Sequence, residues 1–186
     1  LFALIAMVAG MASAQTLSFF GNSAVYHVEG DDWYNAGANW ASTSFQGQNF
    51  GEVYSLTLGG NAETWWSDSL SHPGTTVTMD YEVDEGTANS YVDSVSLPWL
   101  SFSSNNDKFE NMTGEDVIAT SGNAGDGQVH TVDVWFTAIG GTTTLYDSNG
   151  GPNYQATYTA PVPEPATMSL LGLGALAMVL RRKIRK

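Results

Sequence analysis

Five tryptophans lie in or next to segments rich in asparagine, aspartate and serine, which we expect to be loops, and their side chains are candidates for ligand binding. Trp33 and Trp40 lie in EGDDWYNAGANW (29–40), Trp65 and Trp66 in NAETWWSDSL (61–70), and Trp99 next to SFSSNNDKFENMTGED (101–116). A flat indole stacks on the apolar face of a neutral sugar, while neighbouring amides and carboxylates bond to its hydroxyls. We treat them as candidate glycan-stacking residues. The alternative is that they fill a core, where a buried Trp finds a partner for its N–H.

Acidic side chains in turn-like segments form a second candidate site. Asp107 and Glu110 lie in SFSSNNDKFENMTGED (101–116), and Asp126 lies in SGNAGDGQ (121–128). Calcium takes six to eight oxygen ligands from carboxylates, amides and carbonyls, so these three residues are candidate Ca²⁺ ligands. The alternative is a set of ordinary Asx turns on an acidic surface.

No motif for catalysis is present. The chain has no cysteine, and His27, His72 and His130 are isolated, outside any H-E-x-x-H pattern. Paired carboxylates hydrolyse glycosides, but their separation cannot be read from sequence. We therefore expect a body without enzymatic activity, with a glycan-active hydrolase or lyase as the alternative.

The charge distribution excludes several classes of partner. Between residues 15 and 160, Lys108 is the one basic residue, against 18 acidic residues. Such a surface does not neutralise phosphates, which excludes nucleic-acid binding. Without arginine it also has no bidentate group for sulfate or carboxylate, so an anionic polymer would need a bridging cation.

Alternation of apolar and polar residues predicts that strands position these side chains. In TTVTMDYEV (75–83), Val77, Met79, Tyr81 and Val83 share one face, and HTVDVWFTAI (130–139) alternates in the same way. Nine or ten short strands, with no helical period sustained over three turns, predict an all-β fold. We expect an antiparallel β-sandwich of jelly-roll kind.

Both ends of the chain read as targeting segments. Residues 1–14 are an apolar run that ends in Ala12-Ser13-Ala14, a signal-peptide pattern with cleavage by signal peptidase after Ala14. No basic n-region precedes the run, so we expect the given sequence to begin inside the signal.

The carboxyl end consists of an apolar segment followed by a cluster of basic residues. Residues 166–180 hold no charge, and a helix of that length reaches about 22 Å, short of a hydrocarbon core of about 30 Å. The basic residues that follow place the C-terminus in the cytoplasm; they are Arg181, Arg182, Lys183, Arg185 and Lys186. The segment therefore predicts a transmembrane helix that anchors the protein only transiently.

The whole tail, VPEPATMSLLGLGALAMVLRRKIRK (162–186), resembles the PEP-CTERM sorting signal of Gram-negative bacteria. The motif is Pro163, Glu164 and Pro165, followed by the apolar segment and the basic cluster. The resemblance implies that exosortase reads these residues and that the protein accompanies exopolysaccharide in a biofilm matrix. The competing interpretation is an ordinary C-terminal anchor.

These observations divide the chain into three parts: a signal peptide (1–14), a secreted body (15–160) and a sorting tail (161–186). We expect export across the inner membrane, anchoring before processing, and then a place at the cell surface or outside the cell. For the body we predict a glycan-binding or structural β-sandwich whose ligand is a neutral extracellular polysaccharide, with Ca²⁺ as a candidate cofactor.

Overall fold

The structure is a computed structural model that describes residues 15–29 and 45–162. These residues form ten strands and one short helix. The elements are β1 (Leu17–Val28), β2 (Gln48–Glu52), β3 (Leu56–Trp66), β4 (Thr76–Val83), β5 (Tyr91–Leu97), β6 (Trp99–Ser103), β7 (Asn106–Asp116), α1 (Val117–Ser121), β8 (Val129–Gly140), β9 (Thr143–Asp147) and β10 (Tyr154–Thr159).

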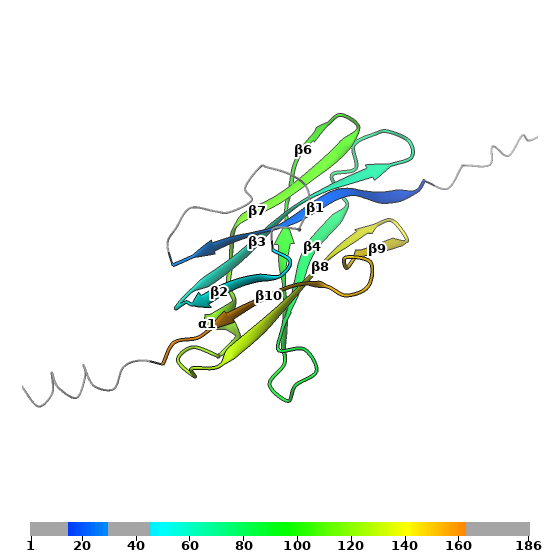
Figure 1. The fold of residues 1–186 in the computed structure, drawn as a ribbon. Helices are drawn as coiled ribbons and strands as arrows, with labels where there is room; N and C mark the ends of the chain where they lie inside the picture. The colour runs from blue at the N-terminus through cyan, green and yellow to red at the C-terminus, as the bar shows by residue number, and fades with distance from the viewer. Residues whose placement is uncertain (1–14, 30–44, 163–186) are drawn as a thin grey trace, which may run out of the picture.

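The strands form two sheets. One has four strands in the order β1-β3-β7-β6, and the other has six, in the order β2-β10-β8-β4-β5 with β9 also paired to β8. Every neighbouring pair is antiparallel except β2 with β10, which is parallel. The two sheets lie as two layers (Figure 1), so the all-β, antiparallel class predicted from the sequence is confirmed.

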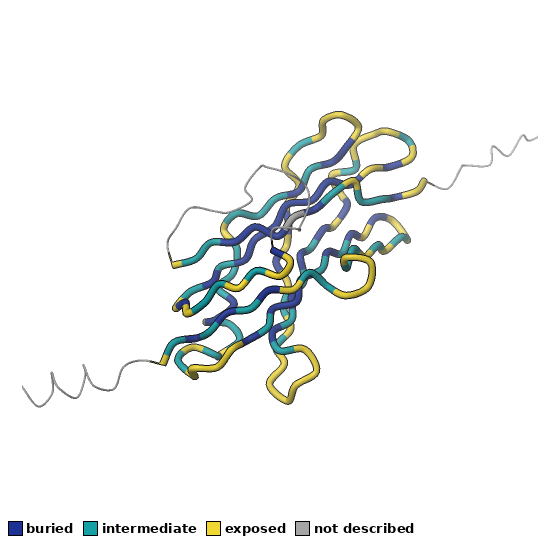
Figure 2. Tube along the Cα trace, in the orientation of Figure 1, coloured by how far each residue is buried: buried dark blue, intermediate teal, exposed yellow. Residues whose placement is uncertain are grey.

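The core lies between the sheets and is built by the predicted alternation. On β4 the predicted inner residues are fully buried, and so are Val132, Val134, Phe136 and Ala138 on β8. In Figure 2 the dark blue of buried residues follows the strands, while the yellow of exposed residues gathers in the connecting turns. The strands therefore bury one face and leave the alternate residues of β4 and β8 on the opposite face.

Two segments that we expected to be loops are strands, and this is a correction. Most of NAETWWSDSL (61–70) belongs to β3, and nearly all of residues 101–116 belongs to β6 and β7. Their polar side chains find partners within the sheet: Glu63 accepts from the Nδ2 of Asn106 at 3.0 Å and pairs with Lys108 at 3.0 Å. Tertiary pairing overrides the turn propensity of the Asn- and Asp-rich sequence.

The two ends of the described chain leave the body at opposite ends (Figure 1). β8 spans the distance between them, from Val129 beside the exit of the chain to Gly140 beside its start. At the exit, the backbone of Gly127 and Gln128 bonds to Ala160, so the body remains paired up to the last residues before the tail.

Among the residues described, no helix is long and apolar enough to cross a membrane. The predicted signal peptide, the apolar segment 166–180 and the basic cluster all lie outside the described residues.

Candidate functional site

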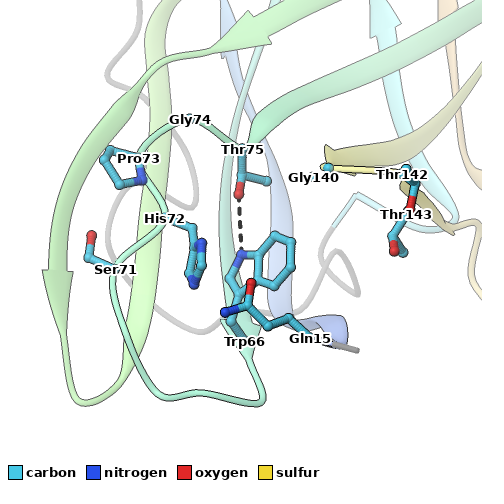
Figure 3. Close-up of a pocket in the computed structure, with 11 residues that line it drawn as sticks. Gln15, Trp66, Ser71, His72, Pro73, Gly74, Thr75, Gly140, Thr142 and Thr143 are labelled. Atoms are coloured by element: carbon cyan, nitrogen blue, oxygen red, sulfur yellow. Dashed lines mark hydrogen bonds between the residues drawn. The ribbon is translucent and has the colours of Figure 1, made fainter. Parts of the chain in front are cut away.

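A polar hollow of about 620 Å³ opens at the end of the sheets where the described chain begins. Its walls are the β3–β4 connection, with Ser71, His72 and Thr75, and the β8–β9 turn, with Thr142 and Thr143. Gln15 lies beside Trp66 at the rim (Figure 3). Hydroxyl, amide and imidazole groups line the hollow, and these suit hydrogen bonds to a small polar ligand.

Trp66 forms a wall of this hollow rather than a stacking surface. Its indole lies stacked on the imidazole of His72, with centroids 4.3 Å apart, and its Nε1 donates to Oγ1 of Thr75 at 3.2 Å. On the ring edge, a Cβ built at Gly140 would lie 2.3 Å from Cζ2 of Trp66. With 6% of its surface exposed, Trp66 offers no open face to a sugar, which corrects its candidate role.

Asp107 holds the β3–β4 connection that walls the hollow. It is 1% exposed, and its carboxylate accepts three hydrogen bonds. The donors are the hydroxyl of Ser71 at 2.7 Å, the backbone N–H of His72 at 2.6 Å and the indole of Trp99 at 2.8 Å. A carboxylate so fully occupied positions a loop and has little left for a cation.

A second carboxylate, Asp68, ties the same connection to the start of the described chain. It accepts from Nε2 of Gln15 at 2.6 Å and lies 3.0 Å from Nε2 of His72. The backbone N–H of Leu70, followed by His72, keeps the pKa of Asp68 below its usual range. Since Ser71 donates to Asp107 and the Nε2 of His72 faces Asp68, these two side chains form no nucleophile–base pair.

The candidate stacking residues do not gather on one face. Trp33 and Trp40 lie outside the described residues. Trp65 is 36% exposed and pairs with Asn106, whereas Trp99 is 41% exposed and pairs with Phe109. Because Asn106 and Phe109 have opposite orientations along β7, the register places Trp65 and Trp99 on opposite faces of the four-stranded sheet.

The candidate calcium ligands are likewise apart. Asp107 and Glu110 lie on β7, not in a turn, and Asp126 lies in the α1–β8 connection, 3.1 Å from the Nε2 of His130. Within residues 15–29 and 45–162, no three His, Asp or Glu side chains form a group that could hold a metal ion. The predicted trio Asp107, Glu110 and Asp126 therefore does not converge.

His130 forms a buried charged cluster at the opposite end of the body. Its Nδ1 lies 2.6 Å from Asp84 and its Nε2 lies 3.1 Å from Asp126, with the Tyr158 ring centroid 5.1 Å from its own. Burial alone would lower the pKa of His130, but the hydrogen bonds and charges of the two carboxylates outweigh it and raise that pKa. The cluster lies beside Gly127 and Gln128, which bond to Ala160.

A further group, which the sequence reasoning passed over, lies on the outer face of the six-stranded sheet. Asp133 is flanked by Glu82 on β4 and Gln155 on β10, and Trp135 follows it on the same face. The signal was already present in the alternation of residues 130–139, which sets Asp133 and Trp135 opposite the apolar core residues. Trp135 lies on a strand, whereas the candidate tryptophans were predicted to lie in or next to loops.

Comparison with known proteins matches the tail of the chain to a known motif. Residues 161–183 match the family described as the PEP-CTERM protein-sorting motif, which confirms the resemblance seen in the sequence. No curated protein and no solved structure matches the chain. The motif marks a protein exported to the cell envelope or surface of Gram-negative bacteria and processed by exosortase.

Proposed function

We propose that the chain is an exosortase-processed surface or matrix protein whose β-sandwich body binds a neutral exopolysaccharide without enzymatic activity. The observation that carries the proposal is the sorting motif at residues 161–183, which begins directly after Ala160, whose backbone bonds to Gly127 and Gln128 of the body. A body paired to its end and followed by a processing signal suits release as an intact unit.

Several finer steps belong to this proposal. Signal peptidase cleaves after Ala14, the apolar segment anchors the precursor transiently with its C-terminus in the cytoplasm, and exosortase then reads Pro163, Glu164 and Pro165. The released body belongs to the exopolysaccharide matrix of a biofilm. Successive strands cross between the two sheets, as in β1 to β2, β2 to β3 and β3 to β4, and such crossings are typical of a jelly-roll sandwich.

The charge of the body supports a neutral ligand. Lys108 is its one basic residue, and this ammonium is paired with Glu63 at 3.0 Å. A sulfated or uronic polymer would meet repulsion from the carboxylates, whereas a neutral glycan needs only hydrogen-bonding groups and an aromatic surface.

The sorting step is tested by replacing Pro163, Glu164 and Pro165 with alanine in the producing cell. The expected result is a tail-retaining precursor in the envelope and loss of the released body. Pro152→Ala, in the turn before β10, is the matched control and leaves release unchanged. If the triple variant releases a shortened body at the normal level, exosortase does not read this motif.

A glycan-active hydrolase or lyase is the alternative, and one observation favours it. Glu82 and Asp133 lie directly opposite each other on neighbouring strands, and burial raises the pKa of Asp133. Two neighbouring carboxylates, one of them with a raised pKa, are an arrangement that an acid–base pair uses. Release of new sugar ends from the polysaccharide, abolished by Asp133→Asn, would establish this alternative.

A further inference from the structure

The outer face of the six-stranded sheet carries a row of polar and aromatic side chains whose positions follow from the strand register. Glu82 on β4 and Gln155 on β10 lie on either side of Asp133, and Asp80 on β4 lies beside Trp135. Thr137 continues the row along β8, next to Tyr146 of β9. We refer to Asp80, Glu82, Asp133, Trp135, Thr137 and Gln155 as the Trp135 face.

Trp135 occupies a special position in this register. On one side its neighbour is Asp80. On the other side, the pairing of β8 with β10 ends at Val134 and its pairing with β9 begins at Phe136. Trp135 therefore has no cross-strand neighbour on that side, where a paired side chain would normally cover the ring. It is half-buried, and Tyr146, one step along the face, is 69% exposed.

The acids of this face are fixed in place by neighbouring groups. Asp80 accepts from the hydroxyl of Thr137 at 2.5 Å, and Glu82 accepts from the hydroxyl of Ser90. Asp133 accepts from Nε2 of Gln155 at 3.0 Å through its Oδ1. Oriented carboxylate and amide groups around an indole are the set that recognises sugar hydroxyls while the ring takes the apolar face of the sugar.

Asp133 supplies an independent indication of a ligand. It is 3% exposed, and its second oxygen, Oδ2, has no hydrogen-bond partner in the structure. A buried polar atom left without a partner costs about 1–3 kcal/mol, and such an atom calls for an explanation. By its register Asp133 points to the Trp135 face, so an incoming hydroxyl group would supply the missing partner.

The charges of the face select the class of ligand. All its ionisable side chains are acidic, and Lys108 lies on the other sheet, paired with Glu63. An anionic polymer would be repelled, and a cation alone has no converging ligands among the described residues. We propose that the Trp135 face is the site at which the body binds a neutral polysaccharide chain, which deepens the proposed function and rests on its glycan-binding part.

The test is affinity electrophoresis of the full chain in mild detergent. The gels contain the neutral fraction of the producer's exopolysaccharide, galactomannan, or alginate as the anionic contrast. The expected result is retardation by a neutral polymer and not by alginate. Trp135→Ala weakens binding roughly tenfold or more, the loss of one stacking anchor, and Trp135→Phe retains part of it. Trp65→Ala, on the four-stranded sheet, is the matched control and binds as the wild type.

The thermal midpoint shows whether Trp135→Ala folds. If it does not, Gln155→Ala keeps the test decisive, because this substitution removes an exposed side chain of the Trp135 face from another strand. We expect Gln155→Ala to weaken binding as well. Wild-type retardation that neither variant changes would overturn the Trp135 face and leave glycan binding intact. No retardation by either neutral polymer, or retardation by alginate alone, would overturn glycan binding and the face together. The sorting step is tested separately, by the alanine variant of Pro163, Glu164 and Pro165. A failure of the sorting proposal is therefore distinguishable from a failure of glycan binding or of the Trp135 face.

Discussion

The indole of Trp99 on β6 donates its N–H to Oδ1 of Asp107 on β7 at 2.8 Å. Asp107 also accepts from Ser71 and from the backbone of His72, both in the β3–β4 connection. One buried carboxylate on β7 thus connects strand β6 to the β3–β4 connection and fixes a wall of the hollow. Asp107 therefore positions the β3–β4 connection. This structural role explains why Asp107, a candidate calcium ligand in the sequence, is buried.

Asp107→Asn should lower the free energy of unfolding by about 1–3 kcal/mol. The side-chain amide of asparagine would place its N–H group opposite one of the hydrogen-bond donors that now bond to a carboxylate oxygen of Asp107. Chemical denaturation measures the change. Glu110→Gln, on the same strand and half-buried, is the control and should change stability little. Equal effects of the two substitutions would show that Asp107 contributes only as a generic polar residue of β7.

The close contact of Gly140 with Trp66 makes a steric prediction. A Cβ at residue 140 would lie 2.3 Å from Cζ2 and 2.8 Å from Cη2 of Trp66, and the indole cannot retreat freely because His72 is stacked on it. Gly140→Ala should therefore cost about 1–3 kcal/mol through overpacking and alter the near-ultraviolet circular dichroism.

The control for this substitution lines the same hollow. A Cβ at Gly74 meets nothing within 4 Å, so Gly74→Ala should leave both the thermal midpoint and the aromatic signal unchanged. A Gly140→Ala protein as stable as the wild type would mean that the wall around Trp66 is loosely packed.

The His130 cluster predicts that stability falls as pH rises above about 6.5. Asp84 and Asp126 raise the pKa of His130 in the folded state despite its burial, so the native protein holds the proton more tightly than the unfolded chain, whose value is about 6.5. The stabilisation is fully present below that value and is lost as pH rises through the folded pKa. The thermal midpoint should therefore decline through this window.

His130→Gln should flatten the decline, because glutamine does not titrate. The comparison is made above about pH 5, since the pKa of Asp126 is lowered by its bonds to Gln128 and His130, against the effect of burial, and its contribution is lost in acid. His72→Gln is the control for removing a histidine at the other end of the body. A wild-type slope retained in His130→Gln would place the titrating group elsewhere.

The strands that could be predicted from the sequence are those with one apolar face. Val77, Met79, Tyr81 and Val83 alternate without interruption, and β4 follows that pattern. The second half of β3 and all of β7 do not show this pattern because polar residues occupy both faces: Thr64 and Asp107 are directly paired, and so are Glu63 and Lys108. The pairing of β3 with β7 joins residues more than 40 positions apart, and no local pattern carries that information.

The candidate site, like the strands, could be predicted from the sequence only in part. Composition singles out the Trp-rich segments, but it does not report which indole keeps an open face. Trp66 is covered by His72 and Gly140, whereas Trp135 lies at the point where β8 changes partners. That position depends on the pairing of β8 with both β9 and β10, which only the assembled sheet defines.

Asp133 allows stability and binding to be separated. Burial first, and then the nearby charge of Glu82, raise the pKa of Asp133, so the folded state holds this proton more tightly than an unfolded Asp, whose value is about 3.9. Stability is therefore greatest below that value and falls as pH rises through the folded pKa. Asp133→Asn should remove this decline and raise the thermal midpoint at pH 7 relative to the wild type.

Asp80→Asn, on the same face, is the control for deleting a negative charge, and thermal midpoints between about pH 4 and 7 provide the measurement. A midpoint for Asp133→Asn below that of the wild type at pH 7 would show that the carboxylate stabilises the fold. The expected gain in stability, accompanied by weaker retardation in the neutral polysaccharide gel, would instead show that the buried acid serves the ligand. A carboxylate that costs stability in the free protein and strengthens ligand binding has the energetics of a binding residue.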